Sequence, residues 1–210
     1  MKLLLVRHGE SRGNLNRQWQ GWLDEPLTDQ GREQARRLAE RLRRWSVENS
    51  EPITAVYSST LTRAFQTAGI LAQSWAVPLV LDWRLRERDV GVLQGLTWPE
   101  IESRHPEIAR TIRQRWTIPV LPGGETVSDL TERVWQAVEA VITRTNGREA
   151  IGNVAIVSHG GAINAYLSRL VGRDDQMPFI FSFGNTSLSM IELRDGRPRI
   201  LLVNDLCHLD

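Results

Sequence analysis

The stretch Lys2-Leu3-Leu4-Leu5-Val6-Arg7-His8-Gly9 decides the fold, because an apolar run ends abruptly in two charged residues and a glycine. A short apolar run of this kind predicts a strand over 2–6 that is buried on both faces, as in a parallel sheet covered by helices. In open α/β sheets, functional groups lie beyond the carboxyl ends of the strands. Arg7 and His8 therefore stand where such a fold places its chemistry.

The rest of the chain alternates strand and helix patterns. Apolar residues recur at helical spacing from Ala35 to Trp45, and the patterns of 61–75, 126–143 and 162–170 also predict helices. Further strands are predicted at 53–57, 78–81 and 153–157, and Asp195-Gly196 is typical of a hairpin turn between 187–192 and 199–203. This alternation predicts an α/β fold with a mostly parallel, helix-covered sheet and an antiparallel edge.

One segment departs from this alternation. From 84 to about 124 the pattern weakens, with four prolines and only short helical runs, so we interpret it as an insertion over the site that sets specificity. The length of 210 residues and the 41% hydrophobic content suit a single domain over 1–210. Ser58-Ser59-Thr60 is predicted to supply N-cap hydroxyls to the helix that follows.

Composition excludes several classes of function. A net charge of +1 predicts neither a nucleic-acid footprint nor a membrane-surface patch. Glu33 and Glu40 interrupt the arginines of the first long helix, so that face is interpreted as solvated rather than as a nucleic-acid site. Every apolar run is too short for a membrane span or a secretory segment. With Cys207 as the single cysteine, we expect a cytoplasmic protein.

Charged groups follow four of the predicted strands. Arg7 and His8 follow the first strand, Arg63 the second, Glu87 the third and His159 the fourth. Each alone has an ordinary structural interpretation, such as a surface charge or a core histidine. Because parallel strands end at a common crevice, the groups are expected to meet there. Two arginines and two histidines around one point would bind a dianion, for which phosphate is the obvious candidate.

Metal and nucleotide chemistry are not indicated. The two other histidines, His105 and His208, lack the spacing of a metal site, and a single cysteine excludes an all-cysteine site. The sequence has neither a G-x-x-x-x-G-K loop nor a G-x-G-x-x-G turn. We therefore predict no metal and no cofactor.

The local sequences resemble the histidine phosphatase superfamily, also called the phosphoglycerate-mutase-like family. The resemblance begins with Leu5-Val6-Arg7-His8-Gly9-Glu10-Ser11 and covers essentially the whole chain. It continues through these stretches: Asn14, Gln20-Gly21, Ser58-Ser59, Arg63-Ala64, Leu85-Arg86-Glu87, Pro122-Gly123-Gly124-Glu125, Val157-Ser158-His159-Gly160-Gly161 and Asn204-Asp205 with His208-Leu209. It implies a three-layer sandwich, with helices on both faces of the sheet, that requires no metal.

The resemblance also implies a role for each matching residue. His8 would attack phosphorus and become phosphohistidine, while Glu87 would protonate the leaving oxygen and later accept a proton from water. The remaining members are Arg7, Arg63 and His159, which would neutralise the transferring group, and the substrate-binding set Asn14, Gln20, Gly21 and Gly160. The imidazole chemistry is self-consistent, because an unprotonated imidazole, with a reference pKa of about 6.5, is nucleophilic at neutral pH.

The substrate and the reaction type stay open at this point. Glycolytic mutases of this family carry a tyrosine and a lysine where this chain has Val90 and Trp98, which favours hydrolysis over mutase activity. The compact length and the chain end resemble metal-independent phosphoserine phosphatases, so L-phosphoserine is the leading substrate, with Arg84, Arg86 or the tail contacting its serine part. Four tryptophans are candidates for an apolar pocket wall, namely Trp19, Trp22, Trp98 and Trp116.

Two alternatives remain beside hydrolysis. One is a phosphoglycerate mutase, and the other is a non-catalytic module that binds phosphorylated ligands. The intact set of His8, Glu87 and His159 argues against the module, because anion binding alone needs no proton donor. The resemblance also suggests a homodimer. A small phosphorylated substrate is the partner expected in every case.

Overall fold

The computed structural model describes residues 1–115, 119–146, 152–173, 180–194 and 197–210. It contains one six-stranded sheet in the order β3-β2-β4-β1-β5-β6. The strands are β1 (Lys2–Arg7), β2 (Ile53–Ser58), β3 (Leu79–Leu81), β4 (Asn153–Ser158), β5 (Leu188–Arg194) and β6 (Arg197–Asp205). The α-helices are α1 (Arg12–Leu15), α2 (Asp29–Glu48), α3 (Thr62–Trp75), α4 (Trp98–Arg104), α5 (Pro106–Arg115), α6 (Val127–Asn146) and α7 (Gly160–Leu170). Within the described residues, no helix combines the length and apolar composition of a membrane span.

The sheet is mixed, as the sequence predicted. β1 pairs in parallel with β4, and β2 pairs in parallel with both β4 and β3. β5 runs antiparallel to β1 and to β6, so the predicted hairpin forms one edge of the sheet. Its Asp195-Gly196 turn lies outside the described residues.

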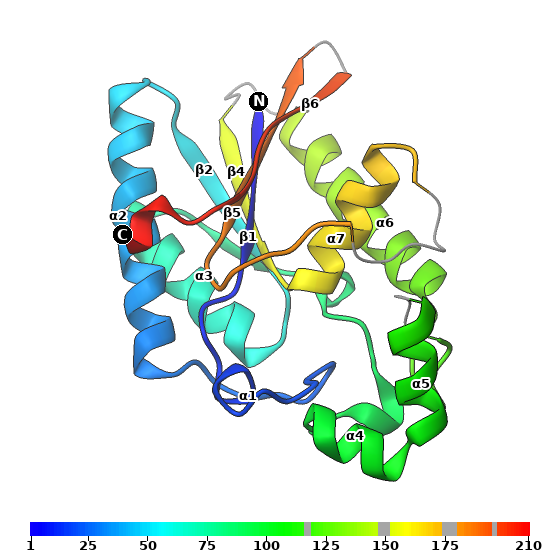
Figure 1. Cartoon of the computed structure of the whole chain (residues 1–210). Helices are drawn as coiled ribbons and strands as arrows, with labels where there is room; N and C mark the ends of the chain where they lie inside the picture. Colours follow the sequence, from blue (N-terminus) through cyan, green and yellow to red (C-terminus); the bar gives the residue numbers. More distant parts are fainter. Residues whose placement is uncertain (116–118, 147–151, 174–179, 195–196) are drawn as a thin grey trace.

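Helices cover both faces of the sheet, which confirms the expected α/β layers. Alternate residues of β1 point to opposite faces, so Leu4 packs against α2 and α3 while Leu3 packs against α6 and α7. Figure 1 shows these two helix pairs on either side of the central strands. Each fully buried leucine contributes about 1.5–3 kcal/mol of hydrophobic stabilisation. β1 is therefore held rigidly between two cores.

The predicted insertion contains two short helices, each with a proline in its first turn. α4 and α5 occupy 98–115, and their buried residues form a separate apolar cluster with Val90, Leu93 and Leu121. Pro99 lies in the first turn of α4, and Pro106 is the first residue of α5. Proline is tolerated in the first turn of a helix because its missing N–H would have no partner there. The expectation of only short helical runs is confirmed, since α4 has 7 residues and α5 has 10.

Two further elements matter for the site. The short 3₁₀ helix η1 (Trp83–Leu85) follows β3 and leads to Glu87, and the 3₁₀ helix η3 (Cys207–Leu209) ends the chain against α2. The carboxyl ends of β1, β2 and β4 all lie at the same end of the sheet. From there the chain continues toward α1, α3 and α7 (Figure 1).

Candidate active site

Two histidines meet at the ends of the central parallel strands. The register pairs Arg7 of β1 with Ser158 of β4. His8 and His159, the next residues along the chain, therefore follow neighbouring strands at the same level of the sheet. Their ring centroids are 5.1 Å apart and the rings are tilted by 59°. Both side chains are buried. The sequence-based expectation that these two residues meet at one edge is confirmed.

A main-chain contact sets the tautomer of His8. Its Nδ1 lies 2.7 Å from the carbonyl oxygen of Gly9. Because a carbonyl only accepts hydrogen bonds, Nδ1 carries the proton and Nε2 keeps its lone pair. Burial, followed by Arg63 and Arg7, lowers the pKa of His8 well below its ordinary value. His8 is therefore a neutral imidazole with a nucleophilic Nε2.

The loop after β1 requires glycine at position 9. A Cβ on Gly9 would lie 2.4 Å from the carbonyl oxygen of Gly31, at the start of α2. The N–H of Gly9 donates to the hydroxyl of Thr67 at 3.0 Å, and that hydroxyl donates to the carbonyl of Arg63 at 2.8 Å. The loop that carries His8 is thus tied directly to the helix that carries Arg63.

His159 is held by a serine at the end of β2. Its Nε2 lies 2.8 Å from Oγ of Ser59, and that oxygen accepts the N–H of Leu61 at 3.2 Å. When the Ser59 hydroxyl donates its proton to Nε2, the single proton of the neutral ring lies on Nδ1. Burial, followed by Arg63, lowers the pKa of His159 well below its ordinary value. The prediction of an N-cap side chain from 58–60 was wrong, because Leu61 is the N-cap of α3 and makes no side-chain bond. Ser59 instead orients His159.

Arg63 is a buried cation fixed by two carbonyl groups. Its Nη1 donates to Leu23 and its Nη2 to Gly21, both at 2.8 Å, and the residue is 1% exposed. Burial lowers the pKa of Arg63 to about 10, so it remains charged at neutral pH. Gly21 has a φ of +50°, which favours glycine at this turn.

Arg7 supplies a second buried cation. One terminal nitrogen donates to the carbonyl oxygen of Phe183, and burial lowers its pKa. A Cβ on Gly160, the first residue of α7, would lie 3.8 Å from Nε of Arg7. The predicted approach of Gly160 to the charged cluster is therefore seen, at the N-terminus of a helix that favours anions.

Three buried nitrogen atoms of this cluster point to an anion. Within the described part of the chain, no residue forms a hydrogen bond with Nε of Arg7, Nε of Arg63 or Nδ1 of His159, although all three atoms are buried. A buried polar atom without a partner costs about 1–3 kcal/mol, and more when charged. A phosphate dianion would supply acceptors for such donors. The site is therefore suited to a phosphorylated ligand.

Glu87 is the carboxyl group of the cluster. The N–H of Arg88 donates to its Oε1 at 2.8 Å, and the N–H of Gly161 donates to its Oε2 at 3.0 Å. The negative charge of Glu87 raises the pKa of both Arg7 and Arg63, opposing the effect of burial. Glu87 therefore interacts with the buried cations and is not an isolated surface charge.

A partly buried ion pair, which sequence reasoning missed, holds the segment that carries Glu87. Arg133 of α6 pairs with Glu125 and donates to the carbonyl oxygens of Arg84, Arg86 and Glu87 at 2.7–2.8 Å. Arg133 resembles any charged residue on a long helix in the sequence. The only signal was Glu125 at the end of the Pro122-Gly123-Gly124-Glu125 stretch.

Asn14 is linked to the main chain of His8 through Asn185, whose Nδ2 contacts both residues. Its Oδ1 accepts the N–H of Ser11 at 3.1 Å and Nδ2 of Asn185 at 3.2 Å. Because a main-chain N–H can only donate, the oxygen of Asn14 is assigned to that side, and its NH₂ group points elsewhere. Those donors suit the predicted phosphate contact. Asn185 was not anticipated from the sequence.

Gln20 and Gly21 contact the cluster indirectly. Oε1 of Gln20 accepts the hydroxyl of Ser11 at 2.8 Å, and the carbonyl of Gly21 accepts Arg63. Both residues support neighbours of the phosphate-binding groups. Their predicted direct contact with substrate stays a prediction.

The predicted tryptophan wall is divided between two places. Trp19 and Trp98 pack together at 6.3 Å against the insertion cluster. Trp22 instead lies beneath the guanidinium of Arg86 at 5.1 Å, and its Nε1 donates to the carbonyl of Glu87 at 2.7 Å. Trp116 lies outside the described residues. Of the three candidate tryptophans that the structure describes, Trp22 is the one seen to contact the segment of Glu87.

Comparisons with known proteins agree with this geometry. Residues 3–206 match the family model of the histidine phosphatase superfamily (branch 1). A relative from Arabidopsis thaliana, named phosphoglycerate mutase-like protein 4, is 34% identical over 212 residues, covering all of this chain and 87% of its own length.

A second relative and a solved structure extend the match. Phosphoserine phosphatase 1 of Hydrogenobacter thermophilus is 32% identical over 209 residues, covering all of this chain and 94% of the relative. The structure of Bacillus stearothermophilus YhfR superposes with a TM-score of 0.87 at 31% identity, covering 100% of this chain and 99% of that one. The sequence motifs, the sheet order and the placement of the two histidines lead to one conclusion: this chain belongs to the histidine phosphatase superfamily.

Proposed function

We propose that this chain is a phosphomonoesterase that hydrolyses a small phosphorylated metabolite through a phosphohistidine on His8. The observation that carries the proposal is the tautomer of His8, whose protonated Nδ1 is held by Gly9 and whose Nε2 lone pair stays available. Buried donors from Arg7, Arg63 and His159 surround it. A nucleophile and an anion-binding cluster are thus assembled at one point.

The chemistry balances with these residues alone. Nε2 of His8 forms a bond to phosphorus while the ester P–O bond breaks, and the leaving oxygen takes a proton from the carboxyl group of Glu87. Water then attacks the phosphohistidine and gives its proton to the Glu87 carboxylate. The P–N bond breaks and its electron pair returns to Nε2. Arg7 and Arg63 offset the negative charge on the equatorial oxygens in both steps, and neutral His159 donates a hydrogen bond to them through Nδ1.

L-phosphoserine is the leading substrate. A relative named phosphoserine phosphatase is 32% identical over the whole chain. Arg86 supports this assignment, because it lies over Trp22 beside the Glu87 segment and donates to Thr60 through Nε. Arg84 is a weaker candidate for the serine contact, since its guanidinium is paired with Asp82.

A mutase is the second candidate, and relatives named phosphoglycerate mutase-like protein 4 and probable phosphoglycerate mutase GpmB favour it. Val90, where the glycolytic mutases are polar, is buried in the insertion cluster and offers no group for a second charged moiety. Hydrolysis is therefore the better proposal. We further propose a single domain over 1–210, with specificity set by 84–124, and a cytoplasmic, metal-independent, homodimeric enzyme.

The test is a substrate panel measured with excess chelator. The panel contains L-phosphoserine, 3-phosphoglycerate, a sugar phosphate and an aryl phosphate, each assayed for phosphate release and for isomerisation. We expect hydrolysis that survives chelation, is lost in His8→Ala and persists in the matched control His105→Ala. Turnover that requires added magnesium would refute the mechanism. Isomerisation of 3-phosphoglycerate faster than phosphate release would favour the mutase.

A further inference from the structure

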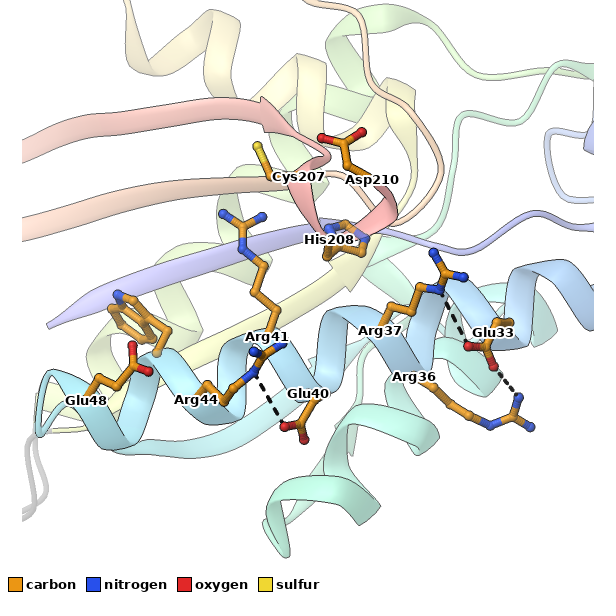
Figure 2. A pocket seen from close by; sticks show the side chains of 11 residues that line it. Glu33, Arg36, Arg37, Glu40, Arg41, Arg44, Glu48, Cys207, His208 and Asp210 are labelled. Atoms are coloured by element: carbon orange, nitrogen blue, oxygen red, sulfur yellow. Dashed lines mark hydrogen bonds and ion pairs between the residues drawn. The ribbon is translucent and has the colours of Figure 1, made fainter.

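The C-terminal turn packs against the outside of the fold, away from the charged cluster. η3 lies against α2, where Asp205 pairs with Arg41 and the carbonyl of Leu209 accepts Arg37 at 3.4 Å. Figure 2 shows the groove between the two elements, with Cys207 and Asp210 at its upper rim and His208 between η3 and α2. His208 has no part in the mechanism above. It is nevertheless buried, at 8% exposure.

The imidazole of His208 contacts the hydroxyl group of Thr186. Its Nε2 lies 2.8 Å from Oγ1 of Thr186, and that hydroxyl donates to the carbonyl of Asn185 at 2.7 Å. Since the hydroxyl has a single proton and the carbonyl can only accept, Nε2 of His208 must be the donor. Burial, followed by Arg41, lowers the pKa of His208 to about 4. His208 is therefore neutral and uses its one N–H on Thr186.

Thr186 is a strained residue. It is fully buried and has a φ of +58°, a left-handed conformation that is rare for a β-branched side chain. A conformation of this kind costs about 1–3 kcal/mol and persists only where surrounding contacts hold it. The contact from His208 is one of those that hold it. Strain of this kind is often found at functional sites.

Thr186 holds the main chain of His8, the proposed nucleophile. Its N–H donates to the carbonyl oxygen of His8 at 3.1 Å, and the side chain of Asn185 donates to the same oxygen at 3.2 Å. Nδ2 of Asn185 also contacts Oδ1 of Asn14 at 3.2 Å. An unbroken series of hydrogen bonds thus runs from His208 through Thr186 to His8 and Asn14.

We propose that His208 is a positioning residue, which fixes His8 and Asn14 by holding Thr186 and Asn185 in place. The C-terminal turn then acts on the catalytic step through the main chain of His8. This inference rests on the proposed function, because its effect is on phosphorylation of His8. The C-terminal turn thereby affects the rate at which His8 is phosphorylated.

The test compares variants of the full-length enzyme in single turnover. With an aryl phosphate as substrate, His208→Ala and Thr186→Val should each slow phosphorylation of His8 by about 10- to 100-fold, the range that a displacement near 1 Å produces. KM should change by less than about threefold, because the phosphate-binding cations stay in place. His208→Gln, which keeps an N–H donor near the position of Nε2, should restore the rate to within about threefold of wild type.

Two comparisons separate positioning from general stability. Arg41→Gln breaks the ion pair of the same segment without touching Thr186, so it should lower the urea midpoint and leave the phosphorylation rate unchanged. The double variant His208→Ala/Thr186→Val should be no slower than the slower single variant, because both interrupt one series of contacts.

Three results would overturn the inference: a wild-type rate in folded His208→Ala, additive losses in the double variant, or an equal rate loss in Arg41→Gln. Absence of a phosphohistidine in the wild-type enzyme would instead overturn the proposed function.

Discussion

The pair Gly160-Gly161 allows a sharp test of the role of Glu87. A Cβ built on Gly161 would lie 2.3 Å from Oε1 of Glu87, whereas a Cβ on Gly160 meets nothing closer than Nε of Arg7 at 3.8 Å. Gly161→Ala therefore displaces the carboxylate. Gly160→Ala is its matched control, because alanine keeps the main-chain N–H through which Gly160 could bind phosphate. Both positions lie in the first turn of α7, where alanine is at least as favourable as glycine.

The magnitude follows from the size of the overlap. Ordinary contact begins near 3.4 Å, so the carboxylate must retreat by about 1 Å, which also strains its 3.0 Å bond from the N–H of Gly161. Misplacement of a catalytic group by 1 Å can cost about 100-fold in rate. We expect Gly161→Ala to lower kcat for phosphoserine by about 100-fold, and Gly160→Ala to stay within about threefold of wild type.

The assay uses two leaving groups. The alkoxide of serine is a poor leaving group that needs a proton, whereas an aryl oxide departs without one. Gly161→Ala should therefore lose less than about tenfold in kcat with p-nitrophenyl phosphate, while its urea midpoint stays at the wild-type value. Equal losses on the two substrates, or equal losses in the two glycine variants, would refute the assignment of Glu87 as the acid.

Three further predictions concern stability and protonation. Arg133→Met removes the buried cation that binds Glu125 and three carbonyl groups, so the free energy of unfolding in urea should fall by about 3–5 kcal/mol. The control Arg43→Gln, in an exposed ion pair, should leave that free energy unchanged. Similar losses in the two variants would contradict this prediction. Because folding lowers the pKa of His208 to about 4, the unfolded chain binds more protons than the folded chain below about pH 6.5. Between about pH 7 and pH 5, the free energy of unfolding of wild type should therefore fall by about 1–2 kcal/mol more than that of His208→Gln. An equal or smaller fall in wild type would contradict this prediction. In NMR titrations of the free enzyme, the ring signals of His8 should stay constant from about pH 8 to pH 6, and a midpoint near 6.5 would show that its imidazole is not shielded from protons.

Much of the site could be predicted because strand ends converge. The apolar run at 2–6 ends at His8, and the strand at 153–157 ends just before His159, so a parallel sheet brings both histidines together whatever the details of packing. The same convergence of strand ends predicts that Arg63 and Glu87 lie near the two histidines. Sheet order was less accessible, because nothing local indicates that β1 lies between β4 and β5.

The supporting contacts could not be predicted, because they join distant residues of ordinary type. Arg133 binds a segment about 46 residues earlier in the chain, and His208 contacts Thr186 across the sheet edge. The left-handed conformation of Thr186 has no local signal, since threonine rarely adopts it. Ser59 carried a signal that could be taken for capping, although its place at a strand end also fitted the site.

The central claim is that Nε2 of His8 receives the phosphoryl group. Wild-type enzyme mixed with ³²P-labelled phosphoserine and quenched in alkali within milliseconds should yield a protein-bound label that is stable in base and lost in acid, with peptide mapping placing it on His8. The label should form no more slowly than steady-state turnover. Turnover without such a label, or a label that persists in His8→Ala, would contradict the account.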